Sequence, residues 1–145
     1  MKFKILFTII LFIFASLGLA DELRNAVDSK DRSEKNIVRD EFRKPYETLS
    51  FFQLEPDMTI VELSPGGGWY TEILANFIRK SGNLIAAHFS KDSDRSYFRN
   101  SRINFEKKVK ENNLYEKVSV VDLNSKLSDP STIDAVLTFR NLHNW

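Results

Sequence analysis

Apolar residues between positions 58 and 139 gather in four short runs, each bounded by polar or turn-forming residues. Short runs rich in Val, Ile and Leu predict strands that are buried on both faces. Longer polar or amphipathic stretches separate the runs, as in a chain that alternates strand and helix. The expected strands span residues 58–63, 84–89, 118–121 and 133–139.

Two of the separating stretches predict helices. In the first, apolar residues recur at spacings of three and four, which is the pattern of one buried helix face, and Gly82 can end the helix in a left-handed conformation. In the second, Asp92 or Ser93 can cap a polar helix that runs to about Asn112. Together these elements predict an α/β fold, with a parallel sheet between helices on both faces. The apolar face of the first helix comprises Tyr70, Ile73, Leu74, Phe77 and Ile78.

Residues 21–57 precede the first strand and predict a helical segment. Fourteen of the 24 residues from Asp21 to Lys44 are charged, which is typical of surface helices. Pro45 can open a further short helix, because the first turn of a helix does not need its missing N–H. The residues of this helix expected to face the core are Tyr46, Leu49 and Phe52.

Residues 1–20 have the three-part pattern of a secretory signal peptide. Lys2 and Lys4 precede an apolar stretch, and Gly18 and Ala20 place small residues at a cleavage site. The apolar stretch is shorter than the roughly 20 residues that a spanning helix needs, which disfavours the alternative of an uncleaved anchor. We therefore expect an exported protein, periplasmic or secreted, that meets the membrane only transiently through this peptide.

The composition excludes several function classes. The chain has 21 basic and 20 acidic residues. Two of the basic residues lie in the signal peptide, so the remainder is nearly neutral, which argues against a nucleic-acid partner. The absence of Cys excludes disulfides and thiolate metal sites. The two histidines, His88 and His143, are far apart and do not form a metal site by themselves.

Residues 61–71, Val-Glu-Leu-Ser-Pro-Gly-Gly-Gly-Trp-Tyr-Thr, place a glycine turn between the first strand and the first helix. Ligands of parallel sheets bind at the carboxyl ends of the strands, where a bare backbone and a helix start can approach them. Glu62 adds a carboxylate that can accept hydrogen bonds. Trp69 stands where a phosphate-binding P-loop needs Lys, and Thr71 replaces the third glycine of a dinucleotide fingerprint.

The stretch Glu62-x-Ser64-x-Gly66-x-Gly68 resembles the acidic-x-Gly-x-Gly-x-Gly motif of class I S-adenosylmethionine-dependent methyltransferases. Two longer segments, "FRKPYETLSFFQLEPDMTIVELSPGGGWYTEILA" and "DAVLTFRNLHNW", resemble a family of exported methyltransferases. The resemblance runs from about residue 40 to residue 145. It implies a Rossmann-like class I methyltransferase sheet.

The resemblance also implies S-adenosylmethionine as cofactor and assigns roles by position. The glycines would pass beneath its methionine part and ribose, and Glu62 would interact with its amino-acid end, directly or through water. Asp122 would hold the adenine amine, although Asp is also common in turns at strand ends. The implied cofactor-binding residues are Glu62, Ser64, Gly66, Gly67, Gly68 and Asp122.

The sequence departs from the family pattern in two places. Ser64 replaces the first glycine of the motif. His88, Phe89 and Ser90 stand at the end of the second strand, where most class I enzymes have an acid that binds both ribose hydroxyls. Ribose recognition then falls to Ser90 or Asp92, and we expect His88 to be structural.

The residues after the fourth strand are implied to lie beside the transferring methyl group; they are Arg140, Asn141, His143, Asn144 and Trp145. Methyl transfer is an in-line displacement that depends on positioning. A base is needed only when the acceptor must lose a proton, and His143 is the candidate for that catalytic role. Two alternatives stay open for His143: a hydrogen-bonded residue that orients the loop, and a substrate contact.

The sequence stops soon after the fourth strand, whereas the sheet it resembles has seven strands. An apolar strand with an open edge is an aggregation hazard, so we expect an N-terminal fragment whose partial domain, residues 58–145, is inactive alone. The expected function of the parent protein is methyl transfer to an unknown acceptor. An exported, non-catalytic small-molecule-binding protein and a structural remnant stay open as alternatives.

Overall fold

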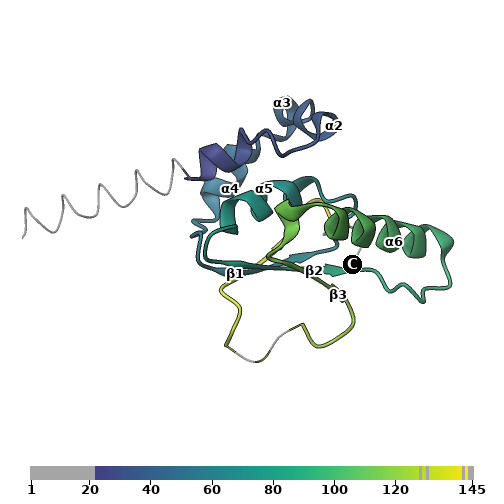
Figure 1. Ribbon diagram of the computed structural model, residues 1–145. Helices are drawn as coiled ribbons and strands as arrows, with labels where there is room; N and C mark the ends of the chain where they lie inside the picture. Colours follow the sequence, from purple (N-terminus) through teal and green to yellow (C-terminus); the bar gives the residue numbers. More distant parts are fainter. Residues whose placement is uncertain (1–21, 128, 130, 142, 144–145) are drawn as a thin grey trace, which may run out of the picture.

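A four-stranded sheet forms the centre of the computed structural model, which describes residues 22–127, 129, 131–141 and 143. The predicted signal peptide lies outside these residues. The strand order is β3-β2-β1-β4, and every pairing is parallel (Figure 1). The parallel α/β sheet and its four strands are therefore confirmed. The strands are β1 Thr59–Leu63, β2 Asn83–His88, β3 Val118–Asp122 and β4 Ala135–Thr138.

Strand β4 is shorter than the apolar run at 133–139 predicts. Before its start, the carboxylate of Asp134 accepts a hydrogen bond from the backbone N–H of Thr59 at 2.7 Å. After its end, the ring of Phe139 stacks on Tyr70 with 3.5 Å between centroids. At the start of the run, the Asp134 side chain accepts from the Thr59 N–H, while the backbone N–H of Asp134 still donates to the Thr59 carbonyl at 3.0 Å. At the other end, Phe139 lies beyond the last paired residue and contacts Tyr70.

Helices α5 (Trp69–Ile78) and α6 (Ser96–Glu111) lie over one face of the sheet (Figure 1). Strands β1, β2 and β3 follow one another in one direction across the sheet, and right-handed crossovers place both connecting helices on the same side. The connection from β3 to β4 passes on the other side, and its described residues contain no helix. The expectation of helices on both faces is therefore met on one face in the described part of the chain.

Helix α6 begins at Ser96, later than a cap at Asp92 or Ser93 predicts. The hydroxyl of Ser93 accepts a hydrogen bond from the backbone N–H of Arg95 at 3.3 Å. Such a local side-chain turn competes with helix formation. Arg95 then takes the N-cap position in an extended conformation, without a side-chain cap.

The predicted N-terminal helical segment packs against the same core as the sheet. Residues 22–27 are helical, and Lys44, with φ of 47°, separates the last two helices so that Pro45 can open α4. Leu49 is fully buried as predicted, whereas Phe52 is 41% exposed. The short helices that follow residues 22–27 are α2 Glu34–Ile37, α3 Asp40–Arg43 and α4 Pro45–Phe51.

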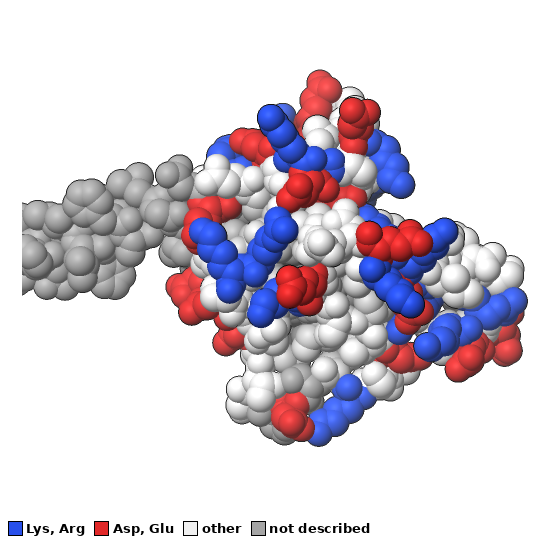
Figure 2. All heavy atoms as spheres, in the orientation of Figure 1, with Lys and Arg blue, Asp and Glu red and all other residues white. Residues whose placement is uncertain are grey.

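The surface carries charges of both signs. Figure 2 shows Lys and Arg side chains interleaved with Asp and Glu over the visible face. None of the helices that the structure describes is long and apolar enough to cross a membrane.

The buried face of α5 predicts that a substitution there lowers the stability of the fold. Ile73 on α5 is fully buried, whereas Ile103 on α6 is 53% exposed. We expect Ile73→Ala to lower the free energy of unfolding by about 2–5 kcal/mol, because it removes buried methyl groups and leaves a cavity. The matched change Ile103→Ala should cost less than about 1 kcal/mol. Urea unfolding followed by circular dichroism measures both, and equal losses would contradict this assignment of the core.

Candidate functional site

The glycine turn follows β1 directly, at the carboxyl edge of the sheet. The backbone N–H of Gly68 donates to the carbonyl of Pro65 at 3.0 Å and closes the turn. Ser64, Gly66 and Gly68 have φ of 53°, 59° and 78°. Two glycines therefore occupy left-handed positions that L side chains rarely adopt, and Ser64 adopts the same region with a side chain present.

The three glycines of the turn have different surroundings. A Cβ added at Gly66 or Gly67 would meet nothing within 4 Å. A Cβ at Gly68 would lie 2.9 Å from the ring of Phe105 and 3.2 Å from Nζ of Lys108. Gly66 and Gly67 therefore present bare backbone to open space, whereas Gly68 is required by packing against α6 and by its position as N-cap of α5.

Three side chains bind the carbonyl groups of the turn. The ring Nε2 of His88 lies 3.1 Å from the carbonyl oxygen of Gly66. Lys108 Nζ donates to the carbonyls of Gly67 and Gly68 at 3.1 and 3.3 Å. Asn141 Nδ2 donates to the carbonyl of Ser64 at 3.2 Å.

Two backbone N–H groups of the turn differ from its carbonyls in having no partner among the described residues. Among the described residues, no acceptor is found for the backbone N–H groups of Gly66 and Gly67. Gly68, the N-cap of α5, has no side chain that could accept a hydrogen bond from the first N–H groups of the helix. The carbonyls are thus held by protein, while donors of the turn and the start of the helix are left for another acceptor.

His88 is fully buried, and both of its ring nitrogens are used. Nδ1 accepts a hydrogen bond from the backbone N–H of Phe89 at 2.8 Å, so Nε2 carries the proton that it donates to Gly66. Burial lowers the pKa of His88, against the opposing effect of the Gly66 carbonyl. The neutral ring therefore supports the turn from β2, in agreement with its predicted structural role.

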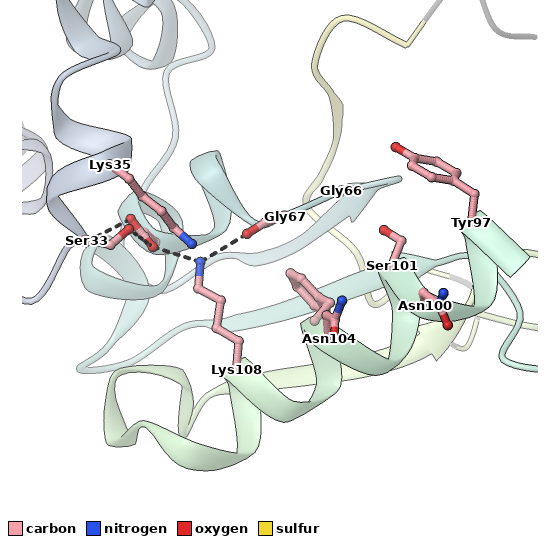
Figure 3. Close-up of a pocket in the computed structure, with 11 residues that line it drawn as sticks. Ser33, Lys35, Gly66, Gly67, Tyr97, Asn100, Ser101, Asn104 and Lys108 are labelled. Carbon is pink, nitrogen blue, oxygen red and sulfur yellow. Dashed lines mark hydrogen bonds and ion pairs between the residues drawn. The ribbon is translucent and has the colours of Figure 1, made fainter.

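A buried carboxylate, Glu72, joins three segments behind the turn. Glu72 is 1% exposed and accepts hydrogen bonds from Lys108 Nζ at 2.8 Å and Ser33 Oγ at 2.9 Å (Figure 3). Burial acts to raise the pKa of Glu72, but hydrogen bonds led by that of Lys108 outweigh it and leave the pKa lowered. Trp69 Nε1 donates to the carbonyl of Asn36 at 2.7 Å and adds a second connection to the N-terminal segment.

Glu62 lies beneath the turn rather than on the wall of a cavity. It is 2% exposed, and its Oε2 accepts a hydrogen bond from Thr71 Oγ1 at 2.6 Å. Burial raises its pKa to about 7, although the Thr71 hydroxyl and the charge of Lys108 act in the opposite direction. Its contact with α5 shows that it connects the end of β1 to the start of that helix.

Two hollows adjoin the turn and share Lys35, Gly66 and Gly67 in their walls. The first has a volume of about 610 Å³ and lies between the turn and α6. Figure 3 shows the α6 side chains that face it across from Gly66 and Gly67. The α6 side chains in this wall are Tyr97, Asn100, Ser101, Asn104, Phe105 and Lys108.

The second hollow, of about 490 Å³, lies on the β4 side of the turn. Ser64 is in its wall, and the Oγ of Ser64 is buried and has no hydrogen-bond partner in the part of the chain that the structure describes. A buried hydroxyl without a partner costs free energy, so this atom is suited to a polar group of a ligand. The remaining walls come from the N-terminal helices and from the residues after β4, including Arg140 and Asn141.

Four predicted site residues line neither hollow: Glu62 and Gly68, described above, and Asp122 and His143. Asp122 ends β3, and its Oδ1 accepts a hydrogen bond from the backbone N–H of Asn124 at 2.9 Å. This bond, and next the hydroxyl of Ser90, lowers the pKa of Asp122. His143 is exposed. The roles of Asp122 in adenine binding and of His143 as a base stay predictions; Leu142, Asn144 and Trp145 lie outside the described residues.

The sequence interpretation missed two groups of residues in the walls. The α6 side chains between positions 97 and 108 recur at helical spacing and form one polar face. Three cations of the N-terminal segment recur at every fourth position. Both signals are periodic, but polar periodicity is also the mark of a solvated helix face. The three cations are Lys35, Arg39 and Arg43.

Within the described part of the chain, no three His, Asp or Glu residues gather as a group that could hold a metal ion. Apart from the carboxylate of Glu72, which is paired with Lys108, the polar groups in the walls of the two hollows are mostly hydroxyls, amides and cations. The arrangement suits an organic ligand with several hydrogen-bonding groups.

Comparison with known proteins gives one informative result. No protein-family model matches the chain, and no curated protein matches it. Among solved structures, the chain is similar to the crystal structure of a SAM-dependent methyltransferase from Aquifex aeolicus, with 19% sequence identity and a TM-score of 0.55. The match covers 86% of this chain and 58% of that one, so this chain spans little more than half the length of the neighbour. The likeness confirms the predicted Rossmann-like methyltransferase fold.

The buried carboxyl of Glu62 predicts a pH dependence of stability. Its pKa of about 7 in the folded protein lies above the ordinary value of 4.5. The folded state therefore holds a proton that the unfolded state has released, and Glu62 destabilises the fold increasingly as the pH rises through this interval. Glu62→Gln keeps an acceptor for Thr71 but cannot ionise.

We expect Glu62→Gln to be more stable than the unchanged protein at about pH 8, by a margin that shrinks toward about pH 5. Urea unfolding across this range measures the margin. The exposed substitution Glu111→Gln controls for the loss of one negative charge. A margin that does not change with pH would contradict the burial of an ionisable Glu62.

Proposed function

We propose that this protein binds S-adenosylmethionine at the glycine turn and takes part in transfer of its methyl group to an acceptor. The observation that carries the proposal is the bare backbone of Gly66 and Gly67, which lies between two hollows with its amide groups unpaired. The likeness of the fold to a SAM-dependent methyltransferase supports the proposal.

The two hollows together offer room and chemistry for the cofactor and an acceptor. Their volumes of about 610 and 490 Å³ lie in the range of small-molecule sites. Unpaired amides and the start of α5 suit the carboxylate of the cofactor. Asn100 and Asn104 offer amide groups that can bond ribose hydroxyls, and Tyr97 offers an aromatic ring for the adenine. We propose that these α6 residues, rather than Ser90 or Asp92, take the place of the acid that β2 lacks, because neither Ser90 nor Asp92 is among the described residues that line the hollows.

When bound, the cofactor supplies a methyl group on a positively charged sulfur. The contribution of the chain is to position the ligands, because in-line transfer needs no covalent step on the protein. The turn is suited to this task, since His88 and Lys108 fix its carbonyl groups. For an acceptor that must lose a proton, His143 stays the proposed base.

Export of the protein is also part of the proposal, and it rests on the sequence pattern of residues 1–20 alone. The nearly neutral charge of the remaining chain supports a small-molecule acceptor rather than a nucleic acid.

Titration of the purified protein with S-adenosylmethionine and S-adenosylhomocysteine by calorimetry tests the cofactor. We expect both to bind, with one site per chain. Adenosine and methionine, added separately, should bind more weakly than either, because each fills one part of the site. The absence of heat with both cofactor forms would reject the methyltransferase and favour a binding protein for another small molecule.

Substitution of the glycines tests the place of binding. Gly67→Ala puts a methyl group into open space, so we expect unchanged stability and an affinity for S-adenosylhomocysteine at least about tenfold lower, or roughly 1.4 kcal/mol. Gly68→Ala should instead lower stability, because its Cβ meets Phe105 and Lys108 and its φ is 78°. Full affinity in a folded Gly67→Ala protein would place the cofactor elsewhere.

A further inference from the structure

Among the described residues, four cations and no carboxylate line the hollow of about 490 Å³. Three come from the N-terminal segment, and the fourth follows β4, so the cluster is assembled from distant parts of the chain. They are Lys35, Arg39, Arg43 and Arg140.

These cations have no anionic partner in the described part of the chain. No described carboxylate lies within 4.0 Å of any of the four. Nearby acids are used elsewhere: Asp40 pairs with Arg32 at 2.6 Å, and Glu72 pairs with Lys108. The cluster is thus an excess of positive charge around a cavity.

Arg43 is the least exposed arginine of the cluster. Its guanidinium lies over the ring of Trp69, 4.7 Å from the centroid. Burial, and then the charges of Arg39 and Arg140, lower the pKa of Arg43. The effects of Arg39 and Arg140 indicate that the like charges act on one another, a repulsion that a bound anion relieves.

The same cavity also has an apolar wall. Trp69 and Phe139 line it, and Phe139 stacks on the ring of Tyr70. Aromatic rings beside arginines suit a molecule that has both an apolar body and a negative group.

The proposed cofactor adds one net positive charge to the site. Its sulfonium is positive, and its single carboxylate balances its own ammonium group. An uncharged or cationic acceptor would leave the sulfonium and the four cations of the cluster without a negative partner among the described residues, and their mutual repulsion would be unrelieved.

We infer that the methyl acceptor is an organic anion, with a carboxylate or phosphate that binds Arg39, Arg43 and Arg140 and an apolar body that lies against Trp69 and Phe139. The role of this molecule as acceptor rests on the proposed function. The binding of an anion at this place can be measured separately from the binding of the cofactor.

Calorimetry with four ring compounds of similar size, in the presence of saturating S-adenosylhomocysteine, tests the inference. The probes are benzoate, phenyl phosphate, the neutral benzamide and the cationic benzylamine. We expect at least one anion to bind, with benzamide at least about tenfold weaker and benzylamine not bound. The stronger of the two anions identifies the carboxylate or the phosphate as the recognised group, and its affinity should fall as salt is added.

Two variants locate the anion. Arg39→Gln and Arg43→Gln should each weaken the better anion at least about fivefold and leave the affinity for S-adenosylhomocysteine within about twofold. Arg39 is exposed, so its variant tests the site without loss of packing. Lys110→Gln, an exposed change on α6 that lines neither hollow, controls for net charge and should change neither affinity.

The outcomes separate the two proposals. If S-adenosylhomocysteine binds but neither anion does, or if benzamide binds as well as the better of the two anions, the inference is overturned and the proposed function stands. If the arginine variants weaken S-adenosylhomocysteine as much as the anion, the cluster serves the cofactor and the inference is overturned. If an anion binds but S-adenosylhomocysteine does not, the proposed function fails, and the assignment of the anion as methyl acceptor fails with it.

Discussion

The buried carboxylate of Glu72 is the contact on which the geometry of the site depends. It lies on α5 and is held by Lys108 from α6 and Ser33 from the N-terminal segment. The ammonium group of Lys108 that pairs with Glu72 also donates to the carbonyls of Gly67 and Gly68. A carboxylate left alone at this depth would be costly. The pair therefore fixes the packing of three segments and the direction of the peptide groups in the turn.

The sheet and α5 could be predicted from the sequence because their burial is periodic. A short apolar run such as the one that ends at Leu63 indicates a buried strand. The spacing of Ile73, Leu74 and Phe77 indicates one face of a helix. The ends of elements were less predictable, since tertiary contacts set them. The side chains of Asp134 and Phe139, at the two ends of β4, contact distant residues, and the local turn at Ser93 delays α6.

The candidate site was predictable where it depends on the backbone and less so where it depends on side chains. Gly66 and Gly67 face open space as the motif suggests, but Glu62 and Gly68 contact α5 and α6. The sequence has no means of distinguishing a glycine that a ligand requires from one that a neighbouring helix requires. The cations of the N-terminal segment were similarly ambiguous, because a charged helix in water and the wall of a polar cavity have the same composition.

The walls of the 490 Å³ hollow come from chain segments as far apart as Lys35 and Arg140. Strand β4 reaches its place beside β1 only after the rest of the described sheet has been synthesised, and contacts of such long sequence separation are slow to form. A chain in which β4 has not yet paired with β1 therefore lacks the wall of the hollow that Phe139, Arg140 and Asn141 provide. A molecule that binds in this hollow therefore stabilises only the folded state in which β4 is paired with β1.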